Sequence, residues 1–228
     1  MSKWMPIVAA AVAVAGLGGW YVTSQNTTGA SNLPTEIGFG AANAQESSGD
    51  VDTSGIVEMV QGADDAPVTI IEYASYTCPH CADFHAGTYK QLKADYIDTG
   101  KVKFIYREVF FDRYGLWASM VARCGGPERF FGISDLIYQG QSTWARAGEP
   151  AAIADELRKI GRLAGLGQEE LQACLTDGDK AQALVAWYEA NAQADGIRST
   201  PSFIIDGQLY SNMSYSEFQR VIDGKLDG

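Results

Sequence analysis

The chain reads VTIIEYASYTCPHCADFH from residue 68 to residue 85, and this stretch decides the fold. Residues 68–74 are almost all β-branched or aromatic, which is typical of a strand buried on both faces of a sheet. The pair Cys78 and Cys81 follows, and a helix-compatible run continues to about residue 96. The sequence therefore predicts a central strand that leads into a dithiol at the start of a helix.

A second strand is expected over residues 102–111, after Gly100 ends the helix. Strand, helix and strand in this order form a βαβ unit. A shorter β-like piece at residues 55–60 precedes the central strand and is separated from it by a turn. The first part of the chain thus contributes three strands.

A helical block is expected over residues 114–194, because apolar residues recur there at helical spacing between Gly and Pro stops. β-character returns at residues 202–205 and 208–210, on either side of an Asp206-Gly207 hairpin turn. A capping-box pattern then starts a last helix over residues 214–226. The sheet is therefore interrupted by helices and resumed.

The expected fold class is α/β, with a central mixed sheet and an inserted α-helical domain at residues 113–195. The sheet comes from residues 51–112 and 196–228. A chain of 228 residues is long enough for one domain with such an insertion.

An export element occupies the start of the chain. No charge appears from residue 4 to residue 22, so residues 1–22 fit a signal peptide or an N-terminal membrane anchor. Residues 23–50 have the polar, small-residue composition of a flexible linker. Ala42-Asn43-Ala44 has the small-x-small form of a cleavage site, but its distance from the apolar stretch favours an uncleaved anchor. Either reading places the rest of the chain outside the cytoplasm.

The net charge of −11 argues against a nucleic-acid partner. Binding to a phosphate backbone requires clusters of Lys and Arg, and the sequence has no such run. The acidic residues are scattered and indicate solubility.

The dithiol has the position that redox chemistry needs. A sulfur at the first turn of a helix meets unpaired N–H groups and the positive end of the helix dipole, which stabilise the thiolate of Cys78. Cys81 lies one turn further on the same face and can close the ring. His80 can add positive charge, and Pro79 stiffens the first turn.

The Cys78–Cys81 pair has two alternative roles, a structural disulfide and part of a zinc site. A structural disulfide between Cys78 and Cys81 would close almost no loop and would stabilise little. A zinc site could combine both with His85, but it would need a fourth ligand that the sequence does not supply. Otherwise, His85 receives no role.

Residues 72–85, with their Cys-Pro-His-Cys motif, resemble the active-site segment of the DsbA family of periplasmic thiol:disulfide oxidoreductases. Thr200-Pro201, at the start of the returning strand, extends the resemblance. It implies a thioredoxin-like fold. It also implies that Pro201 is cis and faces the dithiol, and that the Thr200 backbone pairs with an extended substrate segment.

Glu72 matches a buried glutamate of that family, which by the resemblance relays the proton of Cys81. A carboxylate in an apolar strand suits proton transfer. The family's lysine partner is not evident in this chain, where Tyr106 and Arg107 stand in the following strand. The alternative is that Glu72 is an ordinary exposed strand residue.

Cys124 and Cys174 both fall in the helical block, where some relatives carry a second disulfide, and we expect them to pair. The alternative is two separate buried thiols. Unpaired cysteines are uncommon in oxidising compartments.

The resemblance implies a periplasmic disulfide oxidase that donates the Cys78–Cys81 disulfide to reduced, unfolded exported polypeptides. It implies no cofactor beyond the cysteine pair, a quinone-coupled membrane partner of the DsbB type, and a monomer that contacts the membrane only through its N-terminal segment. A disulfide isomerase or reductase of the same fold is the alternative. A metal-binding module using Cys78, Cys81 and His85 is a third possibility.

Overall fold

The structure is a computed structural model, and it describes residues 51–228. The predictions of a signal peptide or anchor at residues 1–22 and of a linker at residues 23–50 lie outside the described residues. Among residues 51–228, no helix combines the length and apolar character needed to cross a membrane.

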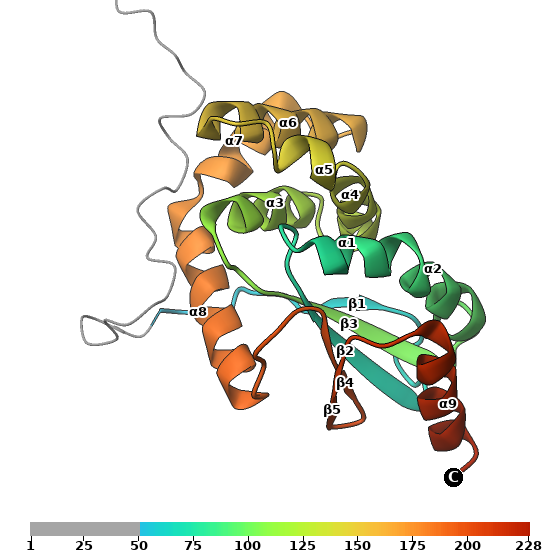
Figure 1. The fold of residues 1–228 in the computed structure, drawn as a ribbon. Coiled ribbons are helices and arrows are strands. Elements are labelled where there is room, and N and C mark those ends of the chain that lie inside the picture. Colours follow the sequence, from blue (N-terminus) through green and yellow to red (C-terminus); the bar gives the residue numbers. More distant parts are fainter. Residues whose placement is uncertain (1–50) are drawn as a thin grey trace, which may run out of the picture.

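A five-stranded mixed sheet with the order β1-β3-β2-β4-β5 forms the centre of the molecule (Figure 1). Its strands are β1 (Met59–Gln61), β2 (Val68–Ala74), β3 (Val102–Glu108), β4 (Ser202–Ile205) and β5 (Gln208–Ser211). Only the β2–β3 pair is parallel, and the other neighbours are antiparallel. The α/β class and the mixed sheet are confirmed.

The strand boundaries differ from the predicted ones at two places. β1 begins and ends later than the predicted piece at residues 55–60. β3 stops at Glu108 rather than at residue 111, because the chain turns there into the Asp112 cap of the next helix. The hairpin turn at Asp206-Gly207 is present, with φ values of 45° and 79° that match a two-residue turn.

The predicted helix after the dithiol is formed in three pieces. They are α1 (Pro79–Ala86), α2 (Thr88–Leu92) and a π-helical turn at Lys93–Ile97. Gly87 separates the first two pieces, with a backbone conformation outside the helical region. The final helix α9 (Tyr215–Leu226) begins with the predicted capping box, in which Glu217 accepts from the Ser214 N–H at 2.8 Å.

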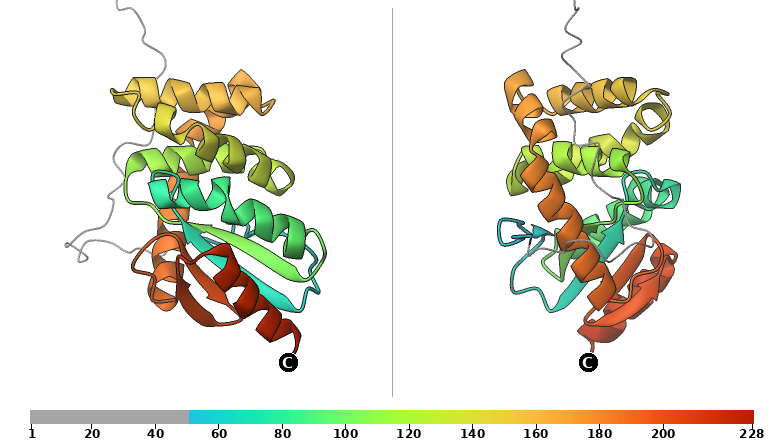
Figure 2. Two further views of the ribbon diagram at one scale, coloured as in Figure 1. Left: turned by 45° about the vertical axis from the view of Figure 1, so that its right-hand side comes forward. Right: turned by 90° about the vertical axis from the view of Figure 1, so that its left-hand side faces the viewer.

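Six helices occupy most of the chain between β3 and β4 (Figures 1 and 2). They are α3 (Arg113–Cys124), α4 (Pro127–Gln139), α5 (Gln141–Trp144), α6 (Pro150–Leu163), α7 (Gln168–Thr176) and α8 (Gly178–Ala194). In Figure 1 most of them stack at one end of the sheet, and α8 runs back alongside it.

The two faces of the sheet are covered differently. α8 packs on the face that carries Tyr73 and Ile204, through Ala192. On the other face Phe203 meets Phe84 of α1 and Phe218 of α9, with ring centroids 4.8 Å apart in both pairs. The core is therefore one continuous apolar layer on each side of β2 and β4.

A disulfide joins Cys124 at the end of α3 to Cys174 in α7, with 5.8 Å between the Cα atoms. It closes 50 residues of the helical insert. Linking residues this far apart restricts the unfolded chain and so favours the folded state.

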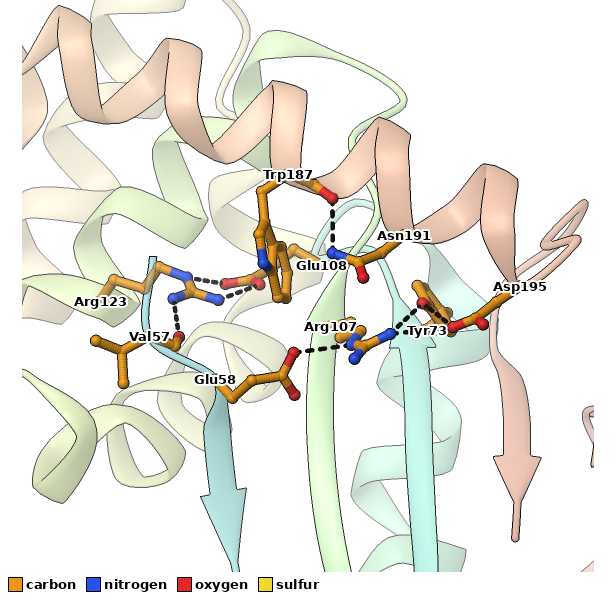
Figure 3. Close-up of polar contacts among 9 residues, drawn as sticks. All are labelled: Val57, Glu58, Tyr73, Arg107, Glu108, Arg123, Trp187, Asn191 and Asp195. Atoms are coloured by element: carbon orange, nitrogen blue, oxygen red, sulfur yellow. Dashed lines mark hydrogen bonds and ion pairs between the residues drawn. The ribbon is translucent and has the colours of Figure 1, made fainter. Parts of the chain in front are cut away.

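A buried ion pair ties the insert to the sheet (Figure 3). The guanidinium of Arg123 donates to both carboxylate oxygens of Glu108, at 2.6 and 2.7 Å, and also to the carbonyl of Val57 at 2.8 Å. Ser119 adds a hydrogen bond to Glu108 at 2.8 Å. The charge of Glu108 is thus compensated within a site that solvent does not reach.

A second arginine, Arg107, makes polar contacts beside the Arg123–Glu108 pair. Arg107 bonds to Glu58 at 3.0 Å, to the Tyr73 hydroxyl at 2.7 Å and to Asp195 at 3.0 Å (Figure 3). Trp187 of α8 lies between Arg107 and Arg123, 5.6 Å from each guanidinium. Val57 and Glu58, just before β1, are therefore bound both to the helical insert through Arg123 and to the sheet through Arg107.

Replacing Arg123 by methionine is expected to lower the free energy of unfolding by about 3–5 kcal/mol, because Glu108 would be left buried without its cation. Urea denaturation followed by circular dichroism measures the effect. Lys159→Met, which removes an exposed pair with Glu156, is the control and should change the stability by less than about 1 kcal/mol. A similar small change in Arg123→Met would contradict the assignment.

Candidate active site

Cys78 is the N-cap residue of α1, with extended backbone angles of φ −83° and ψ 119°. Pro79 occupies the first turn, where the missing N–H costs no hydrogen bond. His80 is exposed beside it, and Cys81 is fully buried. The structure describes both cysteines as free thiols, at the C-terminal side of β2 and the entrance of the helix.

The surroundings of Cys78 stabilise its anion and lower its pKa to about 5. The hydrogen bond from the Cys81 thiol has the largest effect, and burial of the sulfur opposes it. The nearby Thr200 side chain and the backbone N–H groups of Cys81 and His80 lower the pKa of Cys78 further. Cys78 therefore carries a negative charge at neutral pH when the pair is reduced.

Thr200 and Pro201 lie opposite the sulfur, and the peptide bond between them is cis. The Sγ atom of Cys78 is 3.5 Å from the Thr200 carbonyl oxygen. The Thr200 hydroxyl is buried and has no hydrogen-bond partner of conventional geometry within residues 51–228. It is therefore available as a donor to the Cys78 thiolate, in agreement with its effect on the Cys78 pKa.

The pKa of Cys81 is shifted in the opposite direction, above its ordinary value. Burial raises its pKa most, followed by the hydrogen bond to Cys78 and the charge of Glu72. The two sulfurs are thus strongly unequal. Cys78 is the stable anion, and Cys81 holds its proton.

Glu72 is fully buried in β2, and its carboxylate meets the Nε2 atom of His85 at 2.9 and 3.1 Å. The ring of His85 stacks on Tyr138, with centroids 4.3 Å apart. In β3, Tyr106 stands beside Glu72 in the register but bonds to the Tyr138 hydroxyl at 2.6 Å. The alternative of an exposed strand residue is wrong for Glu72.

The partnership with His85 was missed from the sequence, which gave this residue a place only in a zinc site. The available signal was its position one turn beyond Cys81 on the buried side of α1, together with the absence of a lysine near Glu72. Within the described part of the chain, no three His, Cys, Asp or Glu side chains are arranged to hold a metal ion.

An open cavity of about 290 Å³ lies beside the dithiol. Its lining residues are His80, Ser199, Thr200, Pro201, Ser211 and Asn212. The cavity therefore lies between the start of α1, the segment before β4 and the edge strand β5.

A thioredoxin family model matches residues 54–224. Putative protein-disulfide oxidoreductases of Rickettsia bellii and Rickettsia typhi are 33% and 34% identical over 171 residues, covering 75% of this chain and 65% and 62% of theirs. The chain thus spans less than two thirds of the length of these relatives. Disulfide bond formation protein D of Bacillus subtilis is 27% identical, with 75% of this chain and 78% of that protein covered.

A solved structure with the same arrangement is Wolbachia pipientis alpha-DsbA1, with a TM-score of 0.70 and 27% identity over 75% of this chain and 91% of that one. BdbD of Bacillus subtilis gives a TM-score of 0.65 at 25% identity, over 75% and 94% of the two chains. The resemblance to the DsbA family is confirmed by these matches. The chain belongs to the thioredoxin family and, within it, to the DsbA-like proteins.

Proposed function

We propose that this protein is a thiol:disulfide oxidase that donates the Cys78–Cys81 disulfide to reduced polypeptides. The observation that carries the proposal is the unequal acidity of the two sulfurs. A disulfide whose reduced form contains a stabilised thiolate accepts electrons readily. The low pKa of Cys78 favours an oxidase over a reductase.

The reaction transfers two electrons from the client to the enzyme. A client thiolate attacks Sγ of Cys78 in the oxidised pair, and the sulfur of Cys81 leaves and takes up a proton. A second client thiolate then attacks the client sulfur of the mixed disulfide, so that Cys78 leaves as a thiolate and the client is oxidised. The low pKa of Cys78 makes it a good leaving group in this last step.

The groups around the pair support separate parts of this reaction. The Thr200 backbone and the cavity beside it would hold an extended client segment, next to Pro201. The Glu72–His85 pair would exchange the proton of Cys81, since the charge of Glu72 acts on that sulfur. His80 would add positive charge at the exposed side of Cys78.

The setting of the reaction is proposed to be the periplasm. The apolar N-terminal sequence and the Cys124–Cys174 disulfide both fit an oxidising, exported location. Reduced exported polypeptides would be the clients. A quinone-coupled membrane oxidase of the DsbB type would remove the electrons from the dithiol.

Titration of the reduced protein by thiolate absorbance should give a midpoint of about 5 for Cys78. Because the folded pKa lies below the unfolded value, the stability that the thiolate gives the reduced form is complete above about pH 9 and is lost as the pH falls through about 5. Denaturation of reduced and oxidised protein between pH 4 and 9 measures this difference. In Cys78→Ser the absorbance transition near pH 5 should be absent, and a midpoint near the value of free cysteine in the wild type would refute the proposal.

Oxidised protein mixed with a reduced two-cysteine peptide should oxidise the peptide stoichiometrically, followed by mass spectrometry. Cys78→Ser and Cys81→Ser should both lose this activity entirely, because neither variant can form the Cys78–Cys81 disulfide. Equilibration against glutathione should give an oxidising couple. A strongly reducing couple would identify a reductase instead, and activity in Cys78→Ser would overturn the mechanism.

Glu72→Gln should slow the oxidation of the peptide about a hundredfold, which is the low end of the typical effect of acid–base groups. The cause is the loss of the Glu72–His85 pair as the group that delivers a proton to the leaving sulfur of Cys81. Stopped-flow rates across pH measure the change, with Asp83→Asn on the exposed side of α1 as the control. Identical rate profiles for Glu72→Gln and wild type would remove Glu72 from the mechanism.

A further inference from the structure

The loop that presents the dithiol is held by a side chain from the helical insert. Gln141, the first residue of α5, donates from Nε2 to the Tyr76 carbonyl at 2.7 Å and to the Cys78 carbonyl at 2.9 Å. The side chain is buried, and 63 residues of sequence separate it from Cys78. One amide group therefore binds the backbone on both sides of Thr77.

The two acceptors define how Cys78 is oriented. The Cys78 carbonyl belongs to the peptide group that joins it to Pro79, which has no N–H to anchor. The same carbonyl receives the first helical bond of α1, from Ala82 at 3.2 Å. Fixing these peptide groups fixes the direction of the Cys78 side chain relative to the N–H groups of His80 and Cys81.

The position of Gln141 is itself well determined. The indole of Trp144 is buried and donates to the Ile137 carbonyl at 2.8 Å, so it ties α5 to α4. Gly140 makes the turn between these helices, where an added Cβ would come within 3.3 Å of Ile160. The amide of Gln141 is thus presented by packed elements and not by a loose loop.

We propose that Gln141 is a positioning residue for the dithiol, which fixes the peptide groups around Cys78 so that the N–H groups at the start of α1 stay directed at its sulfur. The proposal rests on the oxidase function proposed above and adds a residue of the helical insert to it. The partial positive charge of the amide hydrogens also offsets the two carbonyl dipoles close to the thiolate. Both effects favour the reduced form of the enzyme.

The test is Gln141→Met in the full chain, because methionine keeps an unbranched side chain of similar length and cannot donate. The thiolate midpoint of Cys78 should rise, and the equilibrium constant with glutathione should shift roughly 3- to 10-fold toward a weaker oxidant, as expected for one or two lost hydrogen bonds. Gln139→Leu, which changes an exposed glutamine of α4, is the matched surface control. Ser134→Ala removes the hydroxyl that bonds to the Tyr76 side chain at 2.6 Å and should reduce stability without moving the midpoint.

Folded Gln141→Met with the wild-type midpoint and equilibrium constant would overturn the proposal. Gln141→Glu provides a second variant if methionine impairs folding, and its carboxylate should raise the midpoint further. An unchanged midpoint in folded Gln141→Glu would equally overturn it. A wild-type midpoint near that of free cysteine would instead refute the oxidase function, so the two failures are distinguishable.

Discussion

The stabilisation of the Cys78 thiolate by the groups around it is the interaction on which the rest of the site depends. A helix leaves its first N–H groups without partners, and a sulfur at the N-cap accepts them if its side chain points toward the axis. That condition is geometric. It requires a strand that delivers the chain at a fixed angle, a proline that starts the helix, and an opposing loop at Thr200 that closes the other side.

The second sulfur shows why burial alone does not decide the chemistry. Both cysteines have little exposure, yet burial is outweighed at Cys78 by hydrogen bonds and dominates at Cys81. Beneath Cys81 the protein keeps a carboxylate, and a buried carboxylate needs a partner. His85 supplies it from the same helix that carries the dithiol. The polar pair and the redox pair therefore share one rigid element.

The helical insert acts as part of the site rather than as a separate cover. It contacts the backbone of the loop before Cys78 through Gln141. Asp112, the cap of α3, accepts from the Thr77 hydroxyl at 2.9 Å and so links the start of the insert to the same loop. The buried Glu108–Arg123 pair joins the other end of α3 to the end of β3. An insert fixed at these points can transmit rigidity to a loop that has no regular structure.

Local pattern accounts for what the sequence could predict, and distance in sequence accounts for what it could not. The β-branched run of β2, the Asp206-Gly207 turn and the Ser214–Glu217 capping box are short-range signals, and each element formed where it was expected. The break at Gly87 and the early end of β3, where the chain turns into the Asp112 cap, were not predicted, because a periodic pattern does not mark where an element ends. The contact of Gln141 with Cys78 spans 63 residues. A polar side chain becomes visible as a positioning group only when the fold shows which carbonyls it reaches. Supporting contacts of this kind are therefore found only in the structure, whereas the spacing of the reacting cysteines can be recognised in the sequence.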